Sequence, residues 1–425
     1  MSSLTAGDAV VRIGAMEVAI IGGGIGGLAL ALYLERAKIA CTVYESSPNF
    51  SELGVGINLQ PHAIRTLGEL GLVDALAKVS VEPRETRFFN RHGQLIHTEP
   101  VGRRAGYLWP QFSIHRGDLH DILLSAVKER LGPDAVRPGH RCVRVDQDEA
   151  RVRLSWRSPK DTLLAPTSAD VAIGCDGVHS TLRKQFYPDE GAFVFGGINM
   201  WRGSTRYRPI LTGATVALAG ALSFGKLVIY PMRSYPDGTQ LINWNVEVLS
   251  DVATPNLWNK NGRLEDFIWR YDSARFDWLD VPDLFRKADM ILEYPMVDRD
   301  PIPRWSFGRI TLLGDAAHPM YPRSGNGAAQ SIIDAKVLAQ CLARLPAVEA
   351  LAAYEAQRLE TTNKIVIASR SSPPDLIIET VEARTKGERF ERIEDVIGRD
   401  ELDVILARFK GLTGANIEQV NRADA

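Results

Sequence analysis

The sequence EVAIIGGGIGGLALALYLER occupies residues 17–36 and sets the fold class of the chain. Its first five residues end in four consecutive apolar side chains, the pattern of a strand buried on both faces of a parallel sheet. A Gly22-x-Gly24-x-x-Gly27 turn follows, and residues 28–36 have the composition of a helix. A strand, a glycine-rich turn and a helix in this order predict the first half of a dinucleotide-binding βαβ unit.

The second half of that unit follows at once. Residues 40–44 form a second apolar run, which ends on Glu45, 18 residues after Gly27 and close to the ~20 that the motif requires. We expect Gly22 to allow the tight turn, Gly24 to let the backbone approach a pyrophosphate, and Gly27 to let the helix pack near the strand. Glu45 would bind a ribose diol, which argues against a 2′-phosphate but leaves both NAD and FAD open.

Length and composition narrow the class of protein. A chain of 425 residues has room for two domains, or for one domain with a long insertion. A formal net charge of −2 without a basic stripe gives no support for nucleic-acid binding. The four cysteines lie far apart without metal-ligand spacing, which predicts no metal site and a reduced, cytoplasmic setting. No secretory start and no apolar run of ~20 residues is present, so we predict no membrane span.

Three later stretches bear on the choice between NAD and FAD. They read HRGDLHDILL (115–124), VAIGCDGVHSTLR (171–183) and TLLGDAAHPMYPRSGNGAAQSIIDA (311–335). The last is a second arrangement of strand, Gly-Asp, turn and helix, far along the chain from the first. An NAD dehydrogenase has no use for such a second site, whereas a long cofactor lying across the whole domain does. This distribution favours FAD.

The three ordered motifs GxGxxG, CDGVHSTLR and LLGDAAHPMYPRSGNGAAQ resemble those of the single-component FAD-dependent aromatic hydroxylases. These are the group A flavoprotein monooxygenases of the para-hydroxybenzoate hydroxylase type. The resemblance covers nearly the whole chain. Four further stretches, GVGINLQP (54–61), WRG (201–203), NGRLED (261–266) and YPMVDRDP (294–301), resemble its phenazine-modifying, 5-methylphenazine-1-carboxylate 1-monooxygenase branch.

The resemblance implies non-covalent FAD, NADH or NADPH as co-substrate, and O2. The implied reaction is hydroxylation of a small aromatic or N-heteroaromatic, carboxylated substrate through a flavin C4a-hydroperoxide, so no side chain need act as a nucleophile. Attack at a carboxyl-bearing carbon would expel CO2. An epoxidase or Baeyer–Villiger oxygenase on the same scaffold and a flavin-binding module without oxygenase activity are the alternatives. The chain is expected to be a monomer or a homodimer.

The resemblance also assigns cofactor contacts. Asp315 is expected at the ribityl and pyrophosphate part of FAD, and the Gly325–Gly327 turn beside the isoalloxazine. Independently of the family, a helix that begins near Gly327 would direct unpaired N–H groups and a partial positive charge at the ring edge. The full predicted cofactor set is Gly22, Gly24, Gly27, Glu45, Arg116, Asp176, Gly177, Asp315, Gly325, Asn326 and Gly327.

The pattern predicts an α/β fold with an α+β second domain. Residues 1–75, 105–185 and 290–370 are assigned to a discontinuous Rossmann-like FAD-binding domain. Residues 76–104 and 186–289 are assigned to a substrate-binding domain with an antiparallel sheet, because they contain short aromatic-rich strands. Residues 371–425 contain amphipathic helices, which are expected to cover the cofactor domain or, alternatively, to make a dimer contact.

Substrate contacts are the least determined by sequence. Arg323 could clamp a substrate carboxylate or face solvent. Trp201 and Tyr230 are candidates for the pocket wall, as are Met232, Trp244 and Leu59, and each could equally belong to the core. His179 and His318 are expected to be structural or to face solvent. The pocket is expected between the antiparallel sheet and the flavin.

Overall fold

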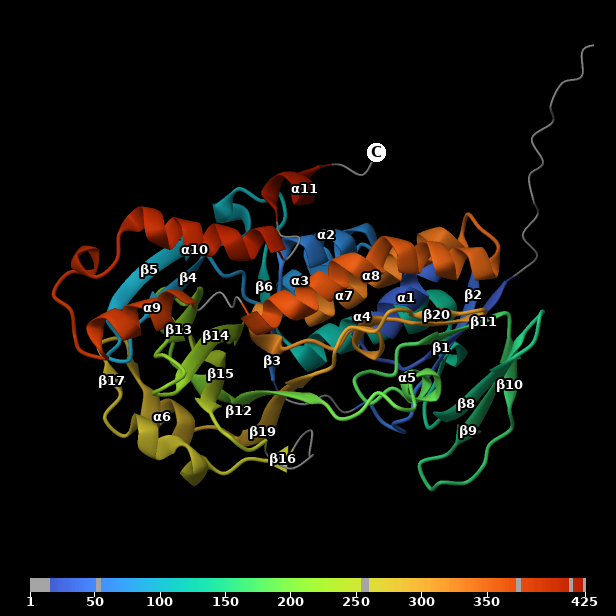
Figure 1. The fold of residues 1–425 in the computed structure, drawn as a ribbon, viewed down its shortest axis with the longest axis horizontal. Coiled ribbons are helices and arrows are strands. Elements are labelled where there is room, and N and C mark those ends of the chain that lie inside the picture. The colour runs from blue at the N-terminus through green and yellow to red at the C-terminus, as the bar shows by residue number, and fades with distance from the viewer. Residues whose placement is uncertain (1–15, 51–54, 254–259, 372–375, 413–415, 423–425) are drawn as a thin grey trace, which may run out of the picture.

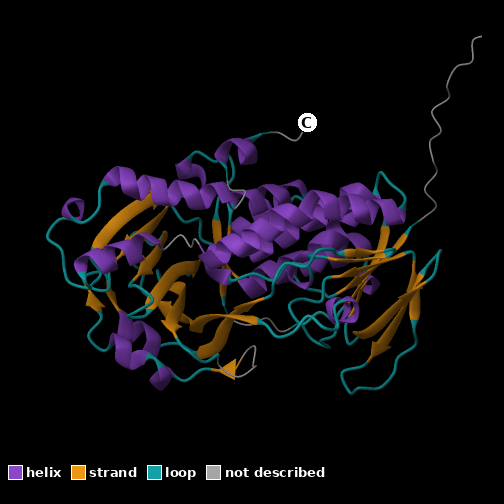
Figure 2. Ribbon diagram, in the orientation of Figure 1, coloured by secondary structure: helices purple, strands orange, loops and turns teal. Residues whose placement is uncertain are grey.

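The computed structural model of the chain describes residues 16–50, 55–253, 260–371, 376–412 and 416–422. Gly54 of the GVGINLQP stretch lies outside these residues. The chain forms two large sheets, one mostly covered by helices and one packed beside it (Figures 1 and 2). None of the helices in the described part of the chain is long and apolar enough to cross a membrane.

The first sheet has six strands in the order β20-β21-β11-β1-β2-β7. Its central strand β1 is buried at Val18–Ile21, which agrees with the apolar run in the sequence. All of its pairs are parallel except the edge pair of β20 and β21. The strands are β1 (Glu17–Ile21), β2 (Ala40–Tyr44), β7 (Val136–Arg137), β11 (Val171–Gly174), β20 (Ser306–Phe307) and β21 (Ile310–Leu312).

Four long helices pack around this sheet and share one apolar core with it (Figure 1). Helix α1 is buried along most of its length because it contacts both α4 and α7. The sequence predicts a start at Leu28, but the helix begins one turn earlier, directly after the glycine turn. The helices are α1 (Ile25–Arg36), α4 (Arg116–Leu131), α7 (Gly327–Leu342) and α8 (Ala347–Ser371).

The second sheet has eight strands in the order β16-β19-β12-β15-β14-β13-β4-β5. Its pairs are antiparallel, as expected, except that β4 runs parallel to β13. The strands are β4 (Glu85–Phe89), β5 (Leu95–Pro100), β12 (Val194–Tyr207), β13 (Thr215–Ala219), β14 (Lys226–Ser234), β15 (Gln240–Leu249), β16 (Lys260–Asn261) and β19 (Met290–Asp298).

Smaller elements complete the fold. A three-stranded sheet that was not expected from the sequence lies at the edge of the first sheet, and β3 pairs with β6 where the two large sheets meet. Their bounds, with those of the short helices, are β3 (Gly56–Leu59), β6 (Phe112–His115), β8 (Arg141–Gln147), β9 (Val152–Arg157), β10 (Thr167–Ala169), β17 (Arg275–Phe276), β18 (Leu279–Asp280), α2 (Pro61–Glu69), α3 (Val73–Val79), α5 (Thr181–Phe186) and α6 (Val281–Arg286).

The C-terminal helices correct one expectation. Helices α9 (Leu376–Thr385) and α10 (Arg399–Leu412) do not cover the first sheet. Their apolar side chains instead share a core with strands of the second sheet, through residues that include Ile377, Val381, Leu402 and Leu406. The amphipathic pattern gave no information about which sheet the helices would meet. The C-terminal segment reaches the helices around the first sheet through α10, which contacts α8, and through the short α11 (Ile417–Asn421), which contacts α2.

Candidate cofactor and substrate site

The three glycines of the first turn have different structural requirements. Gly22 has a φ of +109°, and a Cβ there would lie 2.3 Å from the carbonyl oxygen of Cys175. A Cβ on Gly27 would lie 2.0 Å from the carbonyl oxygen of Gly22. A Cβ on Gly24 would meet no protein atom within 4 Å. The first and third glycines are therefore required by the fold itself, whereas the second leaves open space beside the backbone.

This open space lies at the N-terminus of α1. Gly24 is the N-cap residue, and no side chain caps the first N–H groups of the helix. Such a terminus is suited to bind phosphate, because its N–H groups and its dipole both favour an anion. Glu45 stands beside the turn, where its Oε2 accepts a hydrogen bond from the Gly23 amide at 2.8 Å. Its other oxygen accepts from the Ser47 amide at 2.7 Å.

The second glycine turn faces the same space. Gly325 has a φ of +62°, in the region that favours glycine. Helix α7 then begins at Gly327 without a side-chain cap. The Oδ1 atom of Asp315 lies 3.8 Å from the position of a Cβ on Gly327. The Asp315 side chain is exposed towards the cavity, and protein surrounds it on its other sides. The resulting loss of contact with water raises the pKa of its carboxyl group.

Behind Asp315 lies a buried polar network. The Nε2 atom of His318 lies 2.6 Å from Oδ2 of Asp334, and the Arg358 guanidinium donates to Oδ1 of Asp334 at 2.7 Å. Burial alone would raise the pKa of Asp334, but His318 and Arg358 outweigh it and lower the pKa. His318 therefore has the structural role that was expected, because it ties the loop after Gly314 to α7.

Asp176 and Gly177 take different places. The Asp176 carboxylate accepts hydrogen bonds from the Ser180 hydroxyl at 2.5 Å and the Thr181 amide at 2.7 Å. It thus fixes the start of α5, while Gly177 lines the cavity. Burial raises the pKa of Asp176, and these hydrogen bonds oppose the shift.

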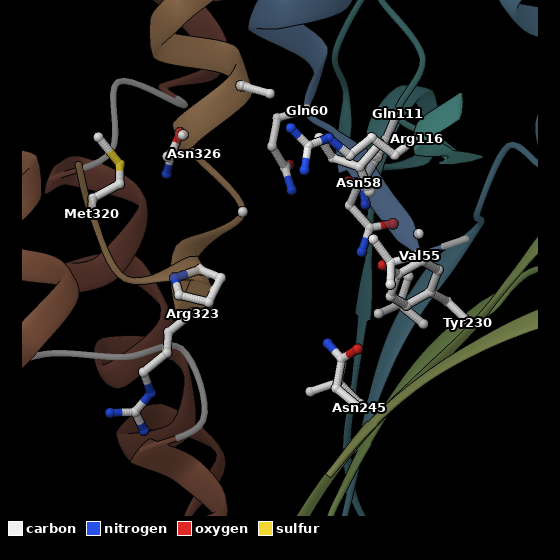
Figure 3. Close-up of a pocket in the computed structure, with 18 of the residues that line it drawn as sticks. Val55, Asn58, Gln60, Gln111, Arg116, Tyr230, Asn245, Met320, Arg323 and Asn326 are labelled. Carbon is white, nitrogen blue, oxygen red and sulfur yellow. The ribbon is translucent and has the colours of Figure 1, made fainter. Parts of the chain in front are cut away.

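A cavity of about 560 Å³ joins these features. Its lining includes Gly24, Gly177, Asp315 and the residues 325–327, and Arg116 at the start of α4. Figure 3 shows two facing walls, with Met320, Arg323 and Asn326 on one and Val55, Tyr230 and Asn245 on the other. Two uncapped helix termini and an open glycine position on one cavity fit the phosphates and the ring of FAD.

The wall opposite Arg323 is the second sheet. The Arg202 guanidinium donates to Oδ1 of Asn245 at 3.0 Å and to the Gly56 carbonyl at 2.8 Å. Tyr230, one of the candidates for the pocket wall, lines the same wall. Burial raises the pKa of its phenol to about 12, although Arg202 opposes the shift. Arg202 and Asn245 were not singled out from the sequence, and only the WRG resemblance pointed near them.

The structure corrects the prediction for Trp201. Its ring lies on the other face of the second sheet, 5.5 Å from the ring of Phe267, in a core that also contains Trp244. Successive residues of a strand point to opposite faces, so Arg202 faces the cavity and Trp201 does not. Leu59 and Met232 are also core residues, with no exposed surface, and do not line the cavity.

The site combines the N-termini of two helices that flank the parallel sheet with a Gly-Asp loop and a facing antiparallel sheet. These features define a single-chain flavoprotein of the aromatic hydroxylase class. The chain belongs to the FAD-binding domain family, whose profile matches residues 15–248 and 260–369. Its fold resembles that of Klebsiella pneumoniae HpxO complexed with FAD and uric acid, with a TM-score of 0.70, 22% identity, and coverage of 96% of this chain and 95% of that one.

Curated relatives are more similar in sequence. Phenazine 1,6-dicarboxylic acid hydroxylase PhzS from Lysobacter antibioticus is 42% identical over 83% of this chain and 89% of its own length. The 6-hydroxynicotinate 3-monooxygenase of Pseudomonas fluorescens is 30% identical over 82% of this chain and 89% of its own length. The chain is therefore an FAD-dependent monooxygenase with NAD(P)H as co-substrate, as the sequence predicted.

Proposed function

We propose that this monooxygenase hydroxylates a small, carboxylated aromatic or N-heteroaromatic compound with O2. The observation that carries the proposal is the single cavity, which runs from the phosphate-binding end at Gly24 to a polar sheet wall at Arg202. Relatives named for a phenazine dicarboxylic acid and for 6-hydroxynicotinate support an aromatic acid as the substrate class.

The residues around the cavity define the contributions of the protein. When bound, FAD accepts hydride from NAD(P)H and activates O2. We assign phosphate binding to the N–H groups after Gly24, and ribose binding to Glu45. The partly positive start of α7 at Gly327 would stabilise negative charge that develops nearby. The remaining predicted cofactor contacts at Arg116, Asp176, Gly177, Asp315, Gly325 and Asn326 belong to the same proposal.

Substrate binding is assigned to the facing walls. Tyr230 and Arg202 would contact the ring from the sheet side, and Arg323 would bind a carboxylate from the opposite loop. A guanidinium can form two parallel hydrogen bonds with a carboxylate, which fixes orientation as well as affinity. Buried apolar wall residues such as Val55 and Met200 would exclude water from the reacting atoms.

The proposal includes the assignment of residues 1–75, 105–185 and 290–370 to cofactor binding and of 76–104 and 186–289 to substrate binding. The test is a screen of aromatic acids for compounds that accelerate NAD(P)H oxidation by the flavin-loaded protein. The masses of the products are then measured by mass spectrometry. Gain of one oxygen atom supports hydroxylation, and replacement of a carboxyl by a hydroxyl group supports the decarboxylating variant. No stimulation by any aromatic compound would contradict the proposal.

A further inference from the structure

A buried ion pair forms part of the cavity wall. The Lys226 ammonium lies 2.7 Å from Oε2 of Glu247, and the two side chains are 3% and 4% exposed. Lys226 on β14 pairs across the sheet with Glu247 on β15. Both residues line the cavity, on the same face as Tyr230 and Asn245, because side chains two residues apart in a strand share a face.

Packing alone gives no reason for charges at this position. The wall around them combines apolar side chains, which include Met200, Val228 and Leu218, with the polar Asn245 two residues from Glu247. Removal of two charges from water is costly, and an apolar pair of similar volume often stabilises a protein as well or better. A charged pair that is kept on the wall of a ligand cavity therefore points to a polar group of the ligand.

We propose that Lys226 and Glu247 form a subsite for a ring edge that carries a donor beside an acceptor, such as the N–H and C=O of a cyclic amide in a heteroaromatic ring. The reason is the chemistry of the pair. An ammonium group only donates hydrogen bonds, and a carboxylate only accepts them. A ligand edge that satisfies both must therefore contain one acceptor for Lys226 and one donor for Glu247.

A free carboxylate does not fit this pair. Both of its oxygens are acceptors, so a carboxylate placed against Lys226 would meet the like charge of Glu247. The pair has no net charge to attract an anion. A carboxylate at another position of the substrate would bind elsewhere, for which Arg323 on the opposite wall is the assigned partner. The proposal rests on the proposed function, since it specifies the substrate class of the same cavity.

The test uses matched ligands on oxidised, flavin-loaded protein, with binding followed by the change in flavin absorbance. One pair is 6-hydroxynicotinate, in its pyridone form, and 4-methoxybenzoate, which can accept a hydrogen bond from Lys226 but has no N–H or O–H to donate to Glu247. The second pair is quinolin-2-one and 2-methoxynaphthalene, which differ in the same way. We expect the wild-type protein to bind the cyclic amide of each pair about ten- to a hundred-fold more tightly, because the charge-assisted hydrogen bond to Glu247 is gained.

The variant removes both charges together, as Lys226→Met with Glu247→Met, because one unpaired charge would destabilise the protein. It should retain flavin and bind both members of each pair with equal affinity. Lys336→Met is the control, since Lys336 forms an ion pair with Glu69 at 2.7 Å outside this cavity. The control should keep the preference for cyclic amides.

Three results would overturn the subsite. They are failure of the wild-type protein to bind either cyclic amide, equal binding of both members of each pair by the wild-type protein, and an unchanged preference in the flavin-loaded double variant. Separate outcomes test the proposed function. If aromatic acids are hydroxylated without any preference for cyclic amides, the function stands and the subsite is wrong. If cyclic amides bind preferentially but no aromatic compound stimulates NAD(P)H oxidation, the subsite stands and the function is wrong.

Discussion

The two large sheets contribute to the cavity in different ways. The parallel sheet contributes main-chain atoms at its carboxyl edge, through turns in which Gly22, Gly24 and Gly325 set the path of the backbone. The antiparallel sheet contributes side chains from its face, among them Arg202 and Tyr230. Backbone geometry needs particular residue types at particular spacings, so it leaves a motif in the sequence. The face of a sheet accepts many residue types, so it leaves no motif in the sequence.

The largest expected effect separates the glycines of the first turn. Gly24→Val should fold but lose its flavin, because the added carbons enter space that no protein atom occupies. Gly22→Val should fail to fold, because its Cβ would collide with the Cys175 carbonyl. Flavin absorbance and circular dichroism of the purified variants measure both outcomes. A Gly24→Val protein that is purified with a full complement of flavin would contradict the assignment.

The second prediction tests which face of the antiparallel sheet lines the site. Trp201→Ala should lower the free energy of unfolding by about 3–5 kcal/mol, as large-to-small changes of aromatic core residues do. Substrate affinity of the folded fraction should not change, because Trp201 lies on the face away from the cavity. Urea unfolding and ligand titration provide the two measurements, and Trp201→Phe is the matched control. If Trp201→Ala lost substrate binding but not stability, the result would show that Trp201 contacts the substrate.

The third prediction concerns Arg323. Arg323→Met should weaken binding of an acidic substrate by about 1.5–3 kcal/mol, or roughly ten- to a hundred-fold, and leave flavin binding unchanged. A neutral analogue without the carboxylate should bind equally to both proteins. Titrations of the flavin-loaded proteins with both ligands decide the matter. Equal effects on the two ligands, or none on either, would show that Arg323 is no carboxylate clamp.

The fourth prediction uses a histidine on the cavity wall. Burial lowers the pKa of His62 to about 4, against the opposing effect of the neighbouring Asn326 side chain. The unfolded chain therefore binds more protons than the folded one as the pH falls below about 6.5. This histidine should cost about 2 kcal/mol of stability between pH 7 and pH 5. Urea unfolding of wild type and His62→Asn at both values should show that loss in the wild type alone.

The smallest expected effect concerns Asp315. Asp315→Ala should weaken FAD binding by about 1 kcal/mol, the net value of one hydrogen bond, in a protein that stays folded. Titration of the apoprotein with FAD measures the difference. Asp334→Ala is the contrasting variant, because it leaves His318 and Arg358 without their shared partner and should reduce stability. An unchanged affinity of Asp315→Ala for FAD would mean that this carboxylate does not contact the cofactor.

The sequence predicted one half of the site better than the other. Strands β1 and β2 have the predicted bounds, and α7 begins at the predicted glycine. For the antiparallel sheet, the sequence predicted the strands but not which side chains of each strand point towards the cavity. A shift of one residue along a strand changes the face, and nothing local distinguishes Trp201 from Arg202 when aromatic residues occupy both faces. Lys226 and Glu247 were missed because the sequence indicates the strands β14 and β15 but not which face of the sheet their charged side chains occupy.

The order of strands in the parallel sheet has a consequence for synthesis of the protein. The central strand β1 has β11 as one neighbour, and β11 pairs in turn with β21, which begins only at residue 310. A chain emerging from the ribosome therefore exposes an incomplete sheet for most of its translation, and such long-range pairing is slow and prone to aggregation. Because FAD binds the finished fold and not the unfolded chain, its supply should raise the yield of native protein by mass action.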